Sequence, residues 1–168
     1  TWTNGEILGE GVANFPNGSV YEGSFAKGKP EGQGKITFAD GGTYSGSWAD
    51  GKITGSGIAT YANGSIYEGA FRNAMHHGRG VMTNPDGYRY EGDWVDGVKE
   101  GTAEIAYPDG AIYKGGIVRG AREGRGVLEM SEGLIFDGIW KDGEITGLGK
   151  LIQPNGDIYE GMLVAGRR

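Results

Sequence analysis

The fold is decided by the stretch Tyr21–Thr43, which reads YEGSFAKGKPEGQGKITFADGGT and recurs along the chain. Its leading aromatic residue returns every 23 residues, without an insertion or a deletion between copies. The aromatic residues at this interval are Tyr21, Tyr44, Tyr67, Tyr90, Tyr113, Phe136 and Tyr159. A glycine follows each of them two residues later, as at Gly23. A fixed period of this length indicates an array of repeats, in which each unit contacts its neighbours along one dimension.

Each repeat is predicted to form one β-hairpin. Tyr21 to Phe25 has aromatic residues at both ends with Gly23 midway between them, and Lys35 to Phe38 is also typical of a strand. Between repeats lies an acid-Gly or Asn-Gly pair such as Asp40-Gly41, which favours a two-residue hairpin turn because both positions need positive φ. Within a repeat, a longer loop from Ala26 to Gly32 is expected. The prediction is an all-β chain: an elongated single-layer antiparallel β-meander of tandem 23-residue hairpins, with roughly 15 strands.

We assign residues 1–168 to a single repeat array. The predicted units are a partial repeat at 1–20, complete repeats at 21–43, 44–66, 67–89, 90–112, 113–135 and 136–158, and a partial repeat at 159–168. The chain starts at Thr1 without a methionine and ends inside a repeat, so we expect it to be a piece of a longer array.

Glycine within the strands is predicted to make room for aromatic rings. Gly23 and Gly34 have no side chain, so a ring from an adjacent strand can lie across the backbone there. The sequence leaves open which face carries the rings. A two-residue turn at Asp40-Gly41 puts Tyr44 on one face, and a register shift of one residue puts it on the other.

Composition narrows the range of functions that the chain can have. A net charge of -6 argues against sequence-independent binding to nucleic acid, because that affinity comes from basic residues neutralising phosphates. The chain has no cysteine, so it forms no disulfide, and cysteine usage does not indicate the cellular compartment. We expect the cytoplasm or a membrane surface. No apolar run approaches the roughly 20 residues of a transmembrane segment.

The sequence offers little for catalysis. Its two histidines, His76 and His77, are adjacent and would point to opposite faces of a strand, which argues against a nucleophilic triad or a metal site. A row of carboxylates follows the tyrosines, as at Glu22 and Glu68, but an open sheet does not seclude them as paired catalytic acids require. We therefore predict no enzymatic activity, no cofactor and no metal. An accessory role beside an enzyme outside this chain is a distant alternative.

Basic residues are candidates for anion binding. Tryptophans recur every 46 residues at Trp2, Trp48, Trp94 and Trp140, and the loops of the alternate repeats are basic. Gly-Arg-Gly, at Arg79 and again at Arg125, can present backbone N–H groups and a guanidinium to a phosphate. The candidate residues for contact with anions or lipid head groups are Lys27, Lys29, Arg79, Arg119, Arg122 and Arg125.

The repeated pattern Tyr-x-Gly-x-aromatic, followed by Gly, Gly-x-Gly and Asp/Asn-Gly, closely resembles the MORN (membrane occupation and recognition nexus) repeat family. A well-matched copy runs from Tyr67 to Phe71 and continues through Gly78-Arg79-Gly80. Departures from the pattern are Ala74 and Ala103 in place of glycine, and Phe136 in place of tyrosine. The resemblance implies the β-repeat fold and narrows the role to contact with phospholipid, contact with protein, or dimerisation.

The leading hypothesis is a non-enzymatic repeat scaffold for protein–protein interaction and self-association, with a homodimer expected. A terminal strand of an open sheet leaves backbone groups unpaired and available to a second copy. The predicted self-association edge consists of Tyr159, Met162, Leu163 and Val164. The alternative is a peripheral module that binds anionic phospholipid through the basic residues.

Overall fold

The computed structural model describes residues 2–3, 6–7 and 9–164, and every helix or strand assigned in this part of the chain is a β-strand. The strands are β1 (Trp2–Thr3), β2 (Glu6–Ile7), β3 (Gly9–Asn14), β4 (Val20–Ala26), β5 (Lys29–Thr37), β6 (Thr43–Ala49), β7 (Lys52–Thr60), β8 (Ile66–Arg72), β9 (Met75–Thr83), β10 (Arg89–Val95), β11 (Val98–Ala106), β12 (Ile112–Val118), β13 (Ala121–Glu129), β14 (Ile135–Lys141), β15 (Glu144–Ile152) and β16 (Ile158–Val164).

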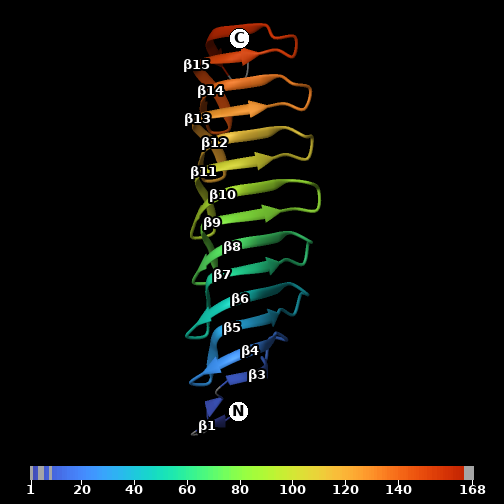
Figure 1. Cartoon of the computed structure of the whole chain (residues 1–168), viewed down its shortest axis with the longest axis vertical. Helices are drawn as coiled ribbons and strands as arrows, with labels where there is room; N and C mark the ends of the chain where they lie inside the picture. Colours follow the sequence, from blue (N-terminus) through green and yellow to red (C-terminus); the bar gives the residue numbers. More distant parts are fainter. Residues whose placement is uncertain (1, 4–5, 8, 165–168) are drawn as a thin grey trace. The chain divides into compact units, whose positions relative to one another are not determined.

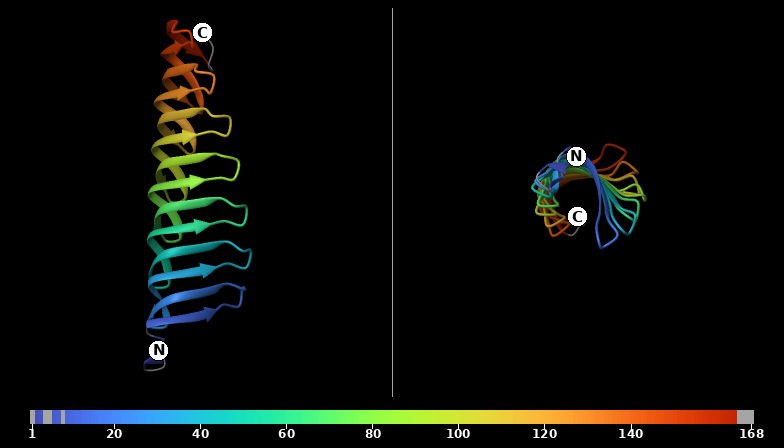
Figure 2. Two further views of the ribbon diagram at one scale, coloured as in Figure 1. Left: turned by 45° about the vertical axis from the view of Figure 1, so that its right-hand side comes forward. Right: turned by 90° about the horizontal axis from the view of Figure 1, so that it is seen from below.

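The predicted antiparallel meander is confirmed. A sheet of 14 strands runs in chain order from β3 to β16, so sequence neighbours are also sheet neighbours. The chain divides into two compact units, Thr1–Pro85 and Asp86–Arg168. Within each unit, Figures 1 and 2 show successive hairpins lying side by side. The expected sheet of roughly 15 strands has 14 strands in the structure, and β1 pairs with β2 in a separate two-stranded sheet.

The two kinds of turn are the reverse of the prediction. The turn within each repeat has two residues, and both have positive φ, as in Lys27 (54°) and Gly28 (75°). That is the geometry whose twist matches the strands of a hairpin. The predicted long loop at Ala26 to Gly32 is therefore wrong, and β5 already begins at Lys29.

The connection between repeats is the longer one. Five residues, Phe38 to Gly42, separate β5 from β6, and the Phe38 N–H donates to the Gly42 carbonyl at 2.8 Å. Only the glycine of the Asp40-Gly41 pair has positive φ (94°). The Asp40 carboxylate instead accepts the Gly42 N–H at 2.9 Å, as short side chains in turns commonly do. The recurring Asp or Asn thus caps a loop and does not form a two-residue turn.

This loop length decides the face of the rings. Thr43 pairs with Thr37, so Tyr44 pairs with Ile36 on the same face. Ile36 also pairs with Tyr21 across the β4–β5 hairpin. The face that carries the leading tyrosines, here called the aromatic face, is therefore the buried one. Five of its tyrosines are at most 1% exposed: Tyr21, Tyr44, Tyr67, Tyr90 and Tyr113.

Candidate binding face

Edge-to-face ring contacts link successive hairpins on the aromatic face of the first unit. Tyr21 contacts Phe25 of its own strand and Trp48 of the next hairpin, with ring centroids 5.1 and 5.0 Å apart. Tyr44 repeats the arrangement, with Trp48 at 5.6 Å and Phe71 at 4.9 Å. Such pairs stabilise a fold beyond the area that they bury. The aromatic residue four positions after the leading tyrosine, Trp48 or Phe71, is therefore the contact between one hairpin and the next in this unit.

Glycine allows the tyrosine rings to lie flat across the neighbouring strand, as predicted. A Cβ atom at Gly34 would lie 2.1 Å from the Tyr21 hydroxyl oxygen, which is closer than atoms can approach. The hydroxyl donates to the Ser24 carbonyl at 2.7 Å. Tyr113 does the same to the Gly116 carbonyl at 2.9 Å, and burial raises the pKa of Tyr113 to about 12. Each buried hydroxyl thus has a backbone acceptor, which its burial requires.

A second set of side chains lies over these rings from the start of each second strand. The residues at this position, 23 apart, are Pro30, Ile53, His76, Lys99, Arg122 and Ile145. The register places them on the aromatic face: Pro30 pairs with Phe25, and Arg122 pairs with the buried Ile117. His76 stacks on Tyr67, with ring centroids 3.8 Å apart and an interplanar angle of 9°. Three consecutive repeats therefore place a nitrogen-bearing side chain where the others have an apolar one.

Lys99 lies among three aromatic rings of the second unit. Its ammonium is 4.5 Å from the centroid of Tyr88, 5.3 Å from that of Tyr90 and 5.8 Å from that of Trp94. It donates a hydrogen bond to the Tyr88 hydroxyl at 2.9 Å. Burial lowers the pKa of Lys99. The ring faces stabilise this partly desolvated cation.

Arg122 occupies the equivalent place one repeat later. Its guanidinium carbon is 4.6 Å from the Trp140 ring centroid. Nε and Nη2 donate to the Gly143 carbonyl at 3.2 and 2.8 Å, and Nη1 donates to the Tyr107 hydroxyl at 3.4 Å. In the part of the chain that the structure describes, no carboxylate forms an ion pair with Lys99 or Arg122.

A groove opens at the margin of the aromatic face in each unit. In the first unit, a groove of about 250 Å³ is lined by residues that include Phe38, Tyr61 and Phe71. In the second unit, a groove of about 420 Å³ is lined by Tyr107, Pro108, Asp109, Ala111, Arg122, Leu128 and Met130. Both grooves combine apolar side chains with a few polar groups, as binding sites for small molecules and peptides do.

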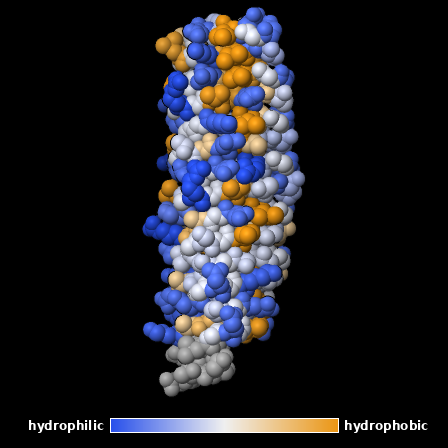
Figure 3. Space-filling model, viewed as in Figure 1, coloured by the Kyte–Doolittle hydropathy of each residue, from blue (hydrophilic) through white to orange (hydrophobic). Residues whose placement is uncertain are grey.

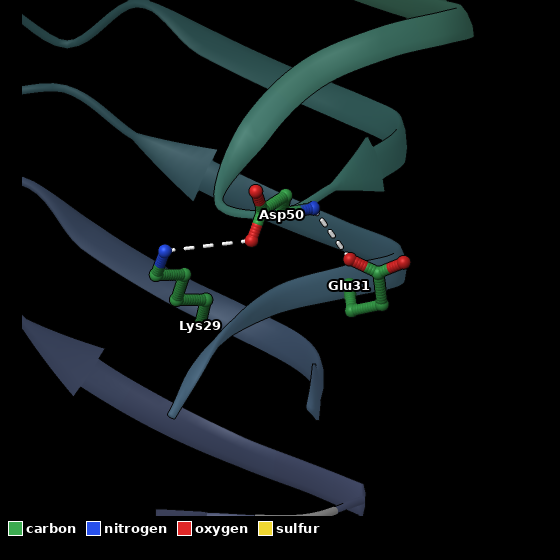
Figure 4. A network of polar contacts seen from close by, with 3 residues as sticks. All are labelled: Lys29, Glu31 and Asp50. Carbon is green, nitrogen blue, oxygen red and sulfur yellow. Dashed lines mark hydrogen bonds and ion pairs between the residues drawn. The ribbon is translucent and has the colours of Figure 1, made fainter. Parts of the chain in front are cut away.

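Polar contacts fasten the two-residue turns at Asp50 and Asp142 to the hairpin before them. Figure 4 shows Lys29 and Glu31 of β5 beside the turn at Asp50: the Lys29 ammonium is 3.4 Å from the Asp50 carboxylate, and the Asp50 N–H donates to Glu31. In the second unit, the Asp142 N–H donates to the Glu123 carboxylate at 2.9 Å in the same way. Lys29, a predicted lipid contact, is thus already paired at an exposed turn.

The predicted basic residues do not form one patch. Lys27 and Arg119 each occupy the first position of an exposed two-residue turn. Arg122 lies on the aromatic face, three residues from Arg125 on the same strand. Arg125 faces the other way and lies 3.8 Å from Asp137 in a shallow groove of the second unit. Arg79 is exposed on β9. The proposed trio of Arg119, Arg122 and Arg125 is therefore distributed over a turn and two opposite faces.

The predicted self-association edge lies on β16, the last strand of the sheet. Leu163 is fully buried and Met162 is 58% exposed, so these neighbours point to opposite faces. Tyr159 donates to the Met162 carbonyl at 3.3 Å. The side chains of Val164 and of Trp2 lie outside the described residues.

The face opposite the aromatic one, here called the outer face, carries an exposed apolar pair near this edge. Leu148 of β15 pairs with Met162 of β16, and Leu148 is 69% exposed. The next outward pair along these strands is Lys150 and Glu160, whose charged groups lie 3.4 Å apart. Figure 3 shows how apolar and hydrophilic side chains alternate in patches on the side of the molecule that it presents.

Sequence reasoning missed Lys99, Tyr88 and Tyr107 and assigned Arg122 to a loop. A signal was available: His76, Lys99 and Arg122 are spaced by one repeat and replace the apolar residues found at Ile53 and Ile145. This spacing could be interpreted only once the strand register showed that the position faces the rings. Among the residues that the structure describes, none form a helix long and apolar enough to cross a membrane.

The chain is a repeat protein whose hairpins stack along one sheet, and it belongs to the MORN repeat family. The MORN repeat model matches residues 1–20, 21–43, 44–66, 67–87, 90–112, 113–134 and 136–158. A comparison with curated proteins found no matching sequence.

Solved structures with a similar fold include two domains that were solved with a bound peptide. The SAS-4 (dCPAP) TCP domain of Drosophila melanogaster, in complex with a proline-rich motif of Ana2 (dSTIL), has a TM-score of 0.56 and 16% sequence identity; the match covers 91% of this chain and 84% of that domain. The TCP10 domain of Danio rerio CPAP, in complex with a STIL peptide, has a TM-score of 0.50 and 18% identity, over 94% of this chain and 79% of that domain. At these identities, the likeness concerns the fold.

Proposed function

We propose that this chain is a non-catalytic protein-interaction array that binds segments of other proteins along its aromatic face. The observation that carries the proposal is the groove of the second unit, about 420 Å³ in volume, which Tyr107, Arg122 and Met130 line beside the aromatic rings. Aromatic residues and arginine dominate the energetics of protein interfaces. Membership of the MORN family and the peptide complexes of the two similar folds support this role.

Selection of peptides from a random displayed library tests the proposal. Peptides selected on the chain should bind Tyr107→Ser at least tenfold more weakly, because an anchor of the groove is lost. The matched control Leu148→Ser removes an exposed apolar side chain from the outer face and should leave affinity unchanged. If only the Leu148→Ser variant lost binding, the binding site would lie on the outer face. A library that yields no ligand would contradict the proposal.

Self-association is a second candidate, favoured by the exposed Leu148 and Met162 pair next to the end of the sheet. An edge strand with exposed apolar neighbours is a ready site for a second copy. In this form of the proposal, the array is a homodimer that uses the outer side of β15 and β16, including the predicted edge residue Met162.

Binding to anionic phospholipid is the alternative that the basic residues suggest. Lys27 and Arg119 support it, because each lies exposed at a turn without an acidic partner among the described residues. Arg122 supports it less, since its guanidinium already donates to Gly143 and Tyr107. Two isolated surface charges contribute about 1 kcal/mol each at an anionic membrane, which is too little for stable attachment by themselves.

A further inference from the structure

The grooves of the two units lie at the same place in the repeat, three repeats apart. Tyr44 pairs with Ala59 in the first unit, as Tyr113 pairs with Leu128 in the second. Ala59 lines the first groove and Leu128 lines the second. Because the strands pair in the same way, the second unit shows which chemical group this place in the repeat accepts.

The group that the rings of the second unit hold is a guanidinium. The guanidinium carbon of Arg122 lies 4.6 Å from the ring centroid of Trp140. It lies 5.7 Å from that of Tyr107 and 5.8 Å from that of Tyr113. Nε and Nη2 donate to the Gly143 carbonyl. A planar, weakly hydrated cation is well suited to stacking on aromatic faces. Three rings and one carbonyl therefore form the surroundings of this cation.

The first unit has equivalent surroundings. Phe38, Tyr44 and Phe71 are the equivalents of the three rings, and all of them line the first groove. The rings of Tyr44 and Phe71 meet edge to face, with centroids 4.9 Å apart. Ala74 lines the groove at the position of Gly143, so its carbonyl is the equivalent of the hydrogen-bond acceptor.

Smaller side chains open the groove of the first unit to a ligand. Ile53 stands at the position of Arg122, so the chain does not place its own guanidinium there. Ala59 stands where the other complete repeats have a larger apolar residue: Ile36, Met82, Ile105, Leu128 and Leu151. Where isoleucine and leucine occupy the two positions together, at Ile145 and Leu151, both are at most 5% exposed. The small side chain of Ala59 therefore accounts for part of the groove, which has a volume of about 250 Å³.

The charge of the first groove is negative. Among the described residues that line it, Asp40 is the only charged one. Its Oδ1 accepts the Gly42 N–H at 2.9 Å, so Oδ2 can accept a hydrogen bond from a ligand. In the second groove, Asp109 is accompanied by Arg122, and the two charges are opposite. The first groove thus combines the surroundings of a guanidinium with an uncompensated carboxylate, and both features complement a cation from another molecule.

We propose that the groove of the first unit binds an arginine side chain from a partner protein. The guanidinium lies against the ring of Phe71 and donates to the Ala74 carbonyl and to the Asp40 carboxylate. Its methylene stem packs against Ala59. Arginine suits these rings better than lysine, because the lysine ammonium is more strongly hydrated. The inference rests on the proposed function, in which the aromatic face binds segments of other proteins, and names the chemistry that one of its grooves accepts.

The test titrates the intact chain with acetylated glycine-serine peptides that carry one central residue. That residue is arginine, its uncharged isostere citrulline, lysine, trimethyllysine or leucine. The NMR signal of the Ile53 methyl group, which lines the groove, reports binding. The arginine peptide should bind about tenfold more tightly than the citrulline peptide, because citrulline keeps the shape and loses the charge. It should also bind more tightly than the other three peptides.

Filling the groove should remove the site. Ala59→Leu should weaken binding of the arginine peptide about tenfold, because it introduces the side chain that Leu151 has beside Ile145 in a repeat of the same fold. The matched control is Ile36→Leu, at the equivalent position one repeat earlier and outside the groove. It should leave the affinity unchanged.

Removing the charge should weaken the site and preserve the loop. Asp40→Asn should weaken binding of the arginine peptide about fivefold. Asparagine fits this position, because Asn63 accepts the Ser65 N–H at 2.9 Å in the equivalent loop one repeat later. Asp109→Asn makes the same change beside the second groove and should leave the Ile53 titration unaltered.

Several results would overturn the inference: no titration of the Ile53 signal, equal binding of the citrulline peptide, tighter binding of the lysine, trimethyllysine or leucine peptide, or full affinity in Ala59→Leu. So would a larger shift of this signal with phosphatidylcholine vesicles, since the choline head group is also an organic cation. Each of these results leaves the proposed function intact if library peptides still depend on Tyr107. Loss of that dependence would overturn the function itself.

Discussion

The indole Nε1 of Trp48 donates a hydrogen bond to the carbonyl oxygen of Gly34, one hairpin earlier, at 3.0 Å. Its ring meets that of Tyr21 on the same earlier hairpin. Trp140 makes the equivalent bond to Gly126 at 2.9 Å in the second unit. A single side chain thus connects consecutive repeats by both packing and hydrogen bonding, and Phe71 supplies only the packing at the equivalent place.

This bond predicts the stability of two variants. Trp48→Ala should lower the free energy of unfolding by about 3–5 kcal/mol, because it leaves a cavity at the contact between hairpins. Trp48→Phe should cost about 1–3 kcal/mol, because the ring remains and only the Gly34 carbonyl loses its partner. Urea denaturation followed by circular dichroism measures both. Equal losses for the two variants would show that ring stacking contributes little.

The backbone conformation of Ala74 predicts that its replacement by glycine stabilises the protein. Ala74 occupies the second position of a two-residue turn and has a φ of 66°. The other two-residue turns within repeats have glycine at this position. An L-residue in this conformation costs about 1–2 kcal/mol, so Ala74→Gly should raise stability by about 1 kcal/mol. The reciprocal control is Gly51→Ala at φ of 80°, where the added Cβ meets only ordinary contacts and the loss is due to the backbone. Thermal denaturation should give shifts of opposite sign; shifts of the same sign would refute the argument.

Buried tyrosines predict loss of stability in alkaline solution. Burial raises the pKa of Tyr67 and that of Tyr113 to about 12, from 10.0 in the unfolded chain. Between these values the folded state holds more protons than the unfolded state, so stability is fully present below pH 10 and falls as the pH rises toward 12. Urea midpoints at pH 9, 10 and 11 should decrease progressively. Tyr113→Phe should make the decrease less steep, and an unchanged slope would exclude Tyr113 as a cause.

The exposed apolar pair predicts the state of association. Light scattering over a hundredfold range of concentration should show a dimer, and Leu148→Lys together with Met162→Lys should return the chain to a monomer, because two charges cannot be buried in an apolar contact. Val12→Lys, at an exposed apolar position in the first unit, is the control. A monomer at every concentration would eliminate self-association. A dimer that persists in the variant would place the interface elsewhere.

The placement of the basic residues predicts the outcome of lipid-binding experiments. If the turns contact head groups, Arg119→Gln should weaken binding to phosphatidylserine vesicles about fivefold, whereas Arg122→Gln should have little effect because its guanidinium is held on the aromatic face. Replacing Arg119, Arg122 and Arg125 together should then do no more than replacing Arg119 and Arg125. Sedimentation with vesicles at low and physiological salt measures this. A native chain that fails to sediment at low salt would remove lipid binding from consideration.

The sequence by itself determined the repeat, the hairpin as its unit, the meander and the fit of tyrosine rings over glycine. These follow from local chemistry repeated at a fixed spacing: Tyr21 needs space beside it, and Gly34 provides it.

Only the tertiary structure decided which turn is short, which face is buried and where each basic residue lies. Asp50-Gly51 and Asp40-Gly41 are the same dipeptide, yet the first forms a two-residue turn and the second caps a five-residue loop. The pairing of whole strands makes that choice, because a shift of one residue would exchange the two faces of the sheet. The same register puts Arg122 beside Trp140 and turns Arg125 away from it, so the placement of Arg122 over the rings follows from strand pairing and not from the spacing of charges along the chain.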